Sequence, residues 1–147
     1  FNFVFPGFEG LLLEGLHVNA GQEAIRVVDA RVVGCSAVAR GTGIFGIRSD
    51  ISDCHVRVVG QWPAVSGIGI VTNFSGTVSG CTVDVTGSTA LSSFAFRGES
   101  DTLFTRCTGR SNIIGFSLGP GCVANGCISG APNNSIDPSV QTNLSNF

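Results

Sequence analysis

Charged side chains recur at one spacing after three of the cysteines of this chain. Arg57, Asp84 and Arg110 each lie three residues after a Cys, and His55 stands directly after the first of these cysteines. A base that removes a proton next to a carboxylate, together with a cation that holds the developing charge, is chemistry that such a set can perform. These four residues are the candidate catalytic residues, and Arg57, Asp84 and Arg110 are also candidate ligand contacts.

Trp62 is a further candidate ligand contact, because an exposed indole offers a flat apolar face of the kind that sugar rings require. It is the only tryptophan and lies in the segment "VVGQWPAVSG" (58–67). A second long segment, "VTGSTALSS" (85–93), follows at the matching place. Lengthened loops on one edge would form a wall beside the charged residues. Trp62 is therefore a candidate ligand contact, and packing against the outside of the fold or a neighbouring chain is the alternative.

Simpler explanations apply to the same residues. Arg57, Asp84 and Arg110 form a solvated charge ladder if they lie on adjacent strands, contributing a fraction of a kcal/mol per pair, roughly. His17 and His55 would then lie two strands apart, about 9.6 Å, which is too far to share a metal ion. No cysteine or histidine has zinc-ligand spacing, so we expect neither a metal site nor a cofactor.

The elements that position these residues follow from a repeat. The phrases "CHVRVVG" (54–60) and "CTVDVTG" (81–87) nearly match, and "GLHVNAG" (15–21) resembles both. The anchor positions are separated by 19, 19, 27, 26 and 20 residues. They are Leu16, Cys35, Cys54, Cys81, Cys107 and Cys127. The period is therefore near 20 residues, with two insertions of about seven.

Apolar residues keep their place relative to each anchor. Three residues before it stand Leu13, Val32, Ile51, Val78, Phe104 and Ala124. Further upstream each unit has an alternating apolar pair, such as Ile25 with Val27, or Phe45 with Ile47. Each unit thus holds about three short strands, which cannot bury their apolar faces until the units stack.

The unit "GIGIVTNFSGTVSGCTVDVTG" (67–87) resembles the repeats of right-handed parallel β-helix proteins of the pectate-lyase-like type. The resemblance covers roughly residues 9–130. It implies an all-β solenoid of about six rungs, with internal ladders of Cys, Val, Ile and Phe. Residues 1–8, "FNFVFPGF", are expected to cap the first rung or to continue from an upstream segment. Residues 131–147 lose the period and are expected to form an irregular tail.

The even spacing also interprets the cysteines. Five of the six occupy one slot per rung, where parallel Cβ vectors point the same way rather than toward each other. We therefore expect a buried ladder of free thiols. A disulfide between Cys122 and Cys127 across a turn is the alternative.

Composition excludes several classes of protein. The 147 residues suit one domain, and a net charge of −2 gives no basic surface for nucleic acid. No apolar stretch reaches the roughly 20 residues that cross a bilayer, so membrane insertion is not expected. The chain begins with Phe1, without a signal peptide, and is interpreted as processed or as a fragment.

Three functions are compatible with the resemblance. The favoured one is a structural and recognition module of a phage tail fibre or tailspike, or of a bacterial surface or secreted protein. It would be trimeric, located on a virion surface or outside the cell, and in contact with a surface polysaccharide. The second is a polysaccharide lyase, epimerase or glycosidase that uses His55, Arg57, Asp84 and Arg110. The third is a filament subunit that stacks end to end.

Departures from the enzymes of the resembled family favour the first function. The chain has no acidic cluster for calcium, no lysine, and no paired aspartates of the hydrolase type. Its close acidic pairs, Asp50 with Asp53 and Glu99 with Asp101, fall in turn-like contexts. Catalysis by this chain alone is therefore not the favoured expectation.

Overall fold

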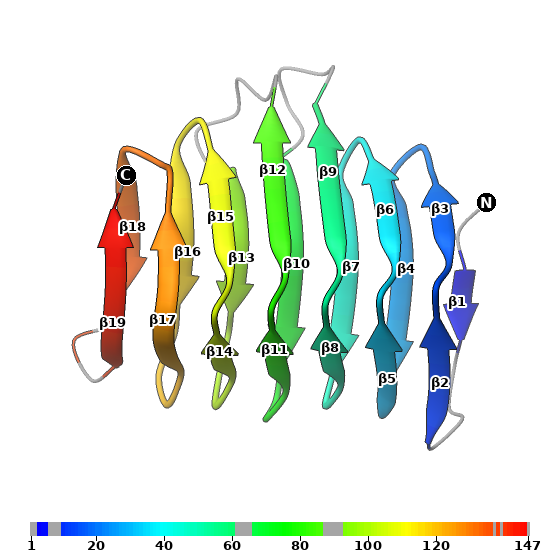
Figure 1. Cartoon of the computed structure of the whole chain (residues 1–147), viewed down its shortest axis with the longest axis horizontal. Helices are drawn as coiled ribbons and strands as arrows, with labels where there is room; N and C mark the ends of the chain where they lie inside the picture. The colour runs from blue at the N-terminus through cyan, green and yellow to red at the C-terminus, as the bar shows by residue number, and fades with distance from the viewer. Residues whose placement is uncertain are drawn as a thin grey trace.

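The computed structural model describes residues 3–5, 10–60, 66–86, 93–136, 138 and 140–146. All regular structure in these ranges is β-strand, and every pairing between strands is parallel. The chain winds as a right-handed coil in which each turn adds one strand to each face (Figure 1). The expected all-β parallel β-helix solenoid is confirmed. Within the described residues, no helix is long and apolar enough to cross a membrane.

One face is a sheet of seven strands, which we call sheet A. Its strands, in spatial order, are β1 (Phe3–Phe5), β4 (Glu23–Val28), β7 (Thr42–Ile47), β10 (Ile68–Asn73), β13 (Phe94–Gly98), β16 (Ile114–Leu118) and β18 (Asn133–Ile136).

The remaining strands form a bent sheet of twelve, sheet B, whose two halves meet at a corner. One half holds β2 (Leu11–Glu14), β5 (Ala30–Val33), β8 (Asp50–Ser52), β11 (Thr77–Ser79) and β14 (Leu103–Thr105). The other holds β3 (His17–Asn19), β6 (Ser36–Ala39), β9 (His55–Val59), β12 (Thr82–Thr86) and β15 (Thr108–Ser111). The halves are joined by β17 (Val123–Ser129), which passes through the corner, and β19 (Gln141–Asn146) pairs with β17.

The corner of sheet B is made by a single left-handed residue before each anchor. Gly34 and Gly80 have φ of 60° and 61°, and Asp53 and Arg106 occupy the same place with φ of 52° and 50°. Such a residue turns the chain sharply without a loop. The next residue is the anchor, and the strand that follows carries the candidate site.

The cysteine anchors form the expected ladder of buried, free thiols. The Cys54 thiol donates to the Ser52 carbonyl at 3.2 Å, and the Cys54 carbonyl accepts from the Thr82 N–H at 2.9 Å. Burial raises the pKa of the Cys35 thiol. Cys122 is also free and buried, so the alternative disulfide with Cys127 is absent.

The core changes composition along the coil while keeping its register. Phe96, Phe104 and Phe116 are fully buried, and the Phe96 and Phe116 rings stack with centroids 4.9 Å apart. Gly109 pairs in register with Val83, and a Cβ on Gly109 would lie 2.9 Å from the Phe96 ring. On this rung the large Phe96 side chain of sheet A thus fills the space that a valine of sheet B, Val83, fills one rung earlier.

The C-terminal segment departs from its expected structure. Residues 131–147 were expected to be an irregular tail, but the described residues continue the coil. β18 pairs with β16 and β19 pairs with β17, each through one register shift. Polar side chains such as Asn133 and Ser135 mask the period without breaking the backbone pairing, because ladder hydrogen bonds do not depend on side chains. At the other end, Phe3–Phe5 pair with β4, while Phe1 and Phe8 lie outside the described residues.

Candidate functional site

Three neighbouring strands bring the predicted charged residues into one row. Asp84 on β12 pairs in register with Arg57 on β9 and with Arg110 on β15. The valines on either side of Arg57 and Asp84 are buried, so alternation turns the charged side chains outward. Arg57 and Arg110 are exposed and Asp84 is half-buried. The row runs along the axis of the solenoid.

Register does not by itself make an ion pair. Among the described residues, ion pairs join Arg26 to Glu23 at 3.7 Å and Arg97 to Glu99 at 3.1 Å, and Arg48 pairs with Asp29. No ion pair joins Arg57 to Asp84 within the described part of the chain. The Arg57 guanidinium is therefore exposed to an approaching anion without a carboxylate of the row to displace.

The row beside the charges is polar. His55 pairs in register with Thr82, and Thr82 with Thr108. His17 is separated from His55 by Ser36, so the two histidines lie two strands apart, as expected. The described residues contain no group of three His, Cys, Asp or Glu side chains that could hold a metal ion.

The residues of the close acidic pairs have roles in the architecture of the coil. Asp50 accepts a hydrogen bond from the Thr77 hydroxyl at 2.5 Å on the neighbouring strand. Asp53 and Asp101 have left-handed backbones at corners, with φ of 52° and 47°.

Most of the expected wall beside the row lies outside the described residues. Trp62 falls in residues 61–65, outside the described residues, and most of the second insertion falls in residues 87–92, also outside them. The role of Trp62 stays a prediction.

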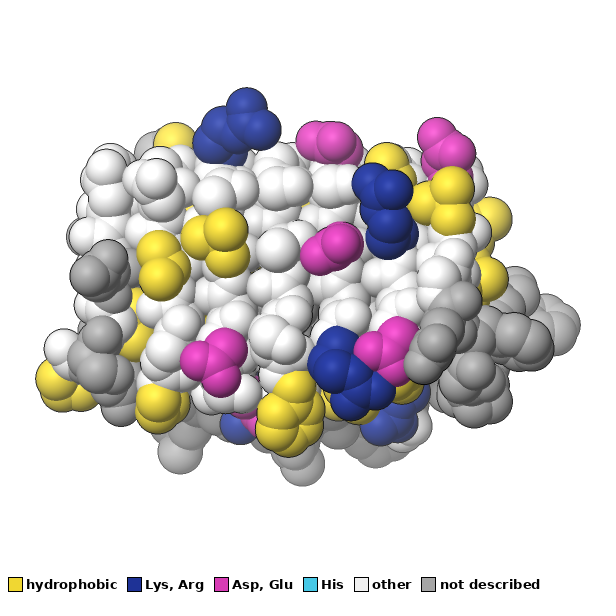
Figure 2. Space-filling view, turned by 90° about the horizontal axis from the view of Figure 1, so that it is seen from below, with side chains coloured by type: hydrophobic (Ala, Val, Ile, Leu, Met, Phe, Trp, Pro, Cys, Tyr) yellow, Lys and Arg dark blue, Asp and Glu magenta, His cyan; other side chains and the backbone are white. Residues whose placement is uncertain are grey.

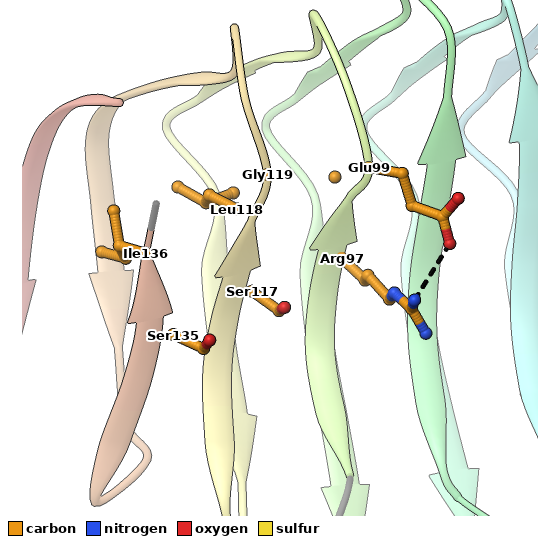
Figure 3. A pocket seen from close by; sticks show the side chains of 8 residues that line it. Arg97, Glu99, Ser117, Leu118, Gly119, Ser135 and Ile136 are labelled. Atoms are coloured by element: carbon orange, nitrogen blue, oxygen red, sulfur yellow. Dashed lines mark ion pairs between the residues drawn. The ribbon is translucent and has the colours of Figure 1, made fainter. Parts of the chain in front are cut away.

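A second feature lies on sheet A, where sequence reasoning placed no site. A hollow of about 470 Å³ opens over β13, β16 and β18 (Figure 3). Its lining includes Arg97, Glu99, Ser117, Gly119, Ser135 and Ile136. Arg97 Nη2 lies 3.1 Å from Glu99 Oε1, and the Arg97 guanidinium carbon lies 5.7 Å from the centre of the Phe94 ring.

The hollow arises from a change of side-chain size along one outward row. In register across sheet A stand Arg26, Phe45, Val71, Arg97, Ser117 and Ser135. The step from Arg97 to two serines lowers the surface over the last two strands. That step is visible in the sequence once the strands are aligned, but the alignment by cysteines does not reach sheet A.

Comparisons with known proteins add little to this description. No family model matches the chain, and no curated protein matches it. Among solved structures, it is similar to a crystal structure of a "putative glycosyl hydrolase" from Parabacteroides merdae, with 10% identity and a TM-score of 0.37. The match covers 93% of this chain and 83% of that one. At this level of similarity, the activity named for that protein has no bearing on this chain.

Proposed function

We propose that this chain is a non-catalytic recognition module that binds an acidic polysaccharide along its surface. The observation that carries the proposal is the register of Arg57, Asp84 and Arg110 on three adjacent strands. The two arginines lie two strands apart, about 9.6 Å along the axis. A polymer lying parallel to that axis meets a cation, an acceptor and a second cation in turn.

The chemistry of the row favours binding over turnover. Guanidinium groups recognise carboxylates through paired N–H donors and stay charged at all ordinary pH values. Threonine hydroxyls at Thr82 and Thr108 supply donors and acceptors beside them. A lyase also needs a base poised to take a proton, and guanidinium groups, which stay charged, suit anion binding better than that role.

The biological setting is a further part of the proposal. By its resemblance to pectate-lyase-like solenoids, the module belongs to a tail fibre or tailspike, or to a bacterial surface or secreted protein. A homotrimer on a virion surface or outside the cell fits that setting. Light scattering on the purified chain measures its molar mass: a trimer supports the setting, and a monomer at all concentrations contradicts it.

The binding test uses polygalacturonate as the probe in isothermal titration calorimetry. We expect Arg57→Ala to weaken binding about tenfold and to lower its dependence on salt. The matched control is Arg31→Ala, which removes an exposed arginine from β5 in the other half of sheet B. Equal losses in both variants would mean that general charge attraction, and not the row, holds the polymer.

Incubation of the wild-type chain with the same polymer tests for catalysis. Lyase products carry a double bond and absorb in the ultraviolet, and hydrolysis releases reducing ends. The proposal expects neither signal. Turnover that disappears in Arg57→Ala and Arg110→Ala would instead establish the enzyme alternative.

A further inference from the structure

We propose that the hollow on sheet A, together with the adjacent corner at Phe74, binds a short neutral oligosaccharide. This site lies on a different sheet from the row of Arg57, Asp84 and Arg110. It does not rest on the function proposed for that row. One feature of the described residues lies in the hollow, and two lie at the adjacent corner.

The first feature is a donor and an acceptor held side by side. The side chains of Arg97 and Glu99 are 41% and 42% exposed, and the pair is joined at 3.1 Å. Adjacent hydroxyls of a sugar each donate and accept, so one can face the guanidinium and the other the carboxylate. Because the two charges cancel, the pair favours a neutral ligand over an anion. The Ser117 and Ser135 hydroxyls follow along the floor (Figure 3).

The second feature is an exposed aromatic residue on a strained backbone. Phe74 is 60% exposed and has φ of 57°, and Ser75 beside it has φ of 54°. A non-glycine residue is uncommon in this region of backbone angles, and a bulky one is rare there. Neither burial nor backbone preference explains a phenylalanine at this position. A flat ring facing solvent does suit the apolar face of a sugar.

Backbone contacts place this corner next to the hollow. The Ser75 N–H donates to the Ser100 carbonyl at 3.4 Å, and the Glu99 N–H donates to the Thr72 carbonyl at 3.1 Å. The turn that carries Phe74 therefore lies against the turn that follows Glu99. Figure 2 looks onto these corner turns, where hydrophobic and charged side chains of both signs lie close together.

The third feature is a buried acceptor at the same corner. Asn73 Oδ1 is buried and accepts no hydrogen bond within the described part of the chain. Such atoms are rare, because a buried acceptor without a partner has lost its hydrogen bonds to water and gained none in return. Asn73 ends β10 directly before Phe74. A sugar hydroxyl is a donor of the right kind for this oxygen once the corner rearranges to admit it.

The test follows amide resonances by NMR during titration with maltose, cellobiose and lactose as neutral probes. Glucuronate serves as the acidic probe. At least one neutral disaccharide should shift the amides of Ser117 and Gly119 in a saturable way, while glucuronate should not. The decisive variant is Phe74→Gly, because glycine relieves the strain and removes the ring. We expect this variant to unfold at the same or a higher temperature and to lose at least tenfold in affinity.

Glu99→Gln is the second variant, since it keeps the shape and removes the charge of the acceptor; it should also weaken binding severalfold. Arg57→Ala is the control and should bind the neutral sugar as the wild type does. The proposal is overturned if no neutral disaccharide shifts these amides, or if glucuronate alone does. It is also overturned if Phe74→Gly and Glu99→Gln bind unchanged. A loss in Arg57→Ala alone would place sugar binding on the other sheet.

Discussion

Val83 occupies the space directly against the α-carbon of Gly69, on the opposite side of the core. A Cβ on Gly69 would lie 2.0 Å from Val83 Cγ1 and 2.5 Å from the Ala95 carbonyl oxygen. Sheet A and the second half of sheet B approach so closely here that a hydrogen is the only side chain that fits. Gly43 meets Val56 in the same way one rung earlier, at 2.1 Å.

Gly69→Ala should therefore destabilise the chain by about 2–3 kcal/mol, the range for a side chain forced into a packed core. Urea denaturation measures the change in the free energy of unfolding. Val83→Ala in the same chain should recover part of the loss, because one of the two clashing groups is removed. Gly21→Ala is the control, since a Cβ at that position has nothing within 4 Å. Equal effects of Gly69→Ala and Gly21→Ala would contradict the close approach.

Gly109→Val tests the exchange of volume between the sheets. Valine stands at this register position on the preceding rung, as Val83, so a consensus of the repeats would choose it. We expect the single substitution to cost about 1–3 kcal/mol, because the new side chain meets the Phe96 ring.

Adding Phe96→Ile, which restores the residue type that Ile70 has one rung earlier, should return most of that stability. Additive losses in the double variant, measured by urea denaturation, would show that the two positions do not share one volume.

The repeat predicts sheet B well and sheet A less well, for a physical reason. The cysteine anchors fix the corner and the strand that follows, so the register of Arg57, Asp84 and Arg110 follows from spacing alone. On sheet A two adjacent residues are buried, as with Gly43 and Ile44, and this breaks the alternation. Phe45, paired with Ile47 in the sequence pattern, therefore lies half-buried on the outer face.

The proposed site on sheet A could not be predicted from the sequence, because the spacing of residues does not reveal the features on which it rests. Phe74 looks like another core phenylalanine in the sequence, and only its backbone angle and exposure distinguish it. The absent Arg57–Asp84 ion pair is a similar case, because register brings two side chains near without fixing their rotamers. Likewise Asn133 and Ser135 pair as strand residues although their polarity suggests an irregular tail.

Two of the buried thiols, those of Cys35 and Cys122, should make the fold sensitive to alkali. Burial raises the pKa of the Cys35 and Cys122 thiols above the ordinary 9.0. The folded chain then holds these protons more tightly than the unfolded chain does. The free energy of unfolding keeps its full value below the ordinary pKa and falls as the pH rises through the raised values.

Urea denaturation at about pH 7 and about pH 10 measures this dependence. Cys35→Ala should show a smaller fall in the free energy of unfolding between the two pH values. A fall as large as in the wild type would mean that another group is responsible.

The last prediction concerns the left-handed corner residues. Some are glycine and others are not, although their backbone angles are nearly equal. Ser75 has φ of 54° and Gly34 has φ of 60°, and a Cβ on Gly34 would have nothing within 4 Å. Glycine and non-glycine residues at such corners therefore differ in stability through backbone strain and not through side-chain clashes. Ser75→Gly should raise the free energy of unfolding by up to about 1 kcal/mol, and Gly34→Ala should lower it by about 1 kcal/mol.

Thermal unfolding of both variants checks the two signs together. Ser79→Gly is the matched control, because Ser79 lies in β11. Glycine there relieves no strain and only raises the conformational entropy of the unfolded chain, so this variant should lower the free energy of unfolding. If Ser75→Gly destabilises as much as Ser79→Gly does, the corner before β11 is not strained. In that case the backbone argument for a functional role of Phe74 fails as well.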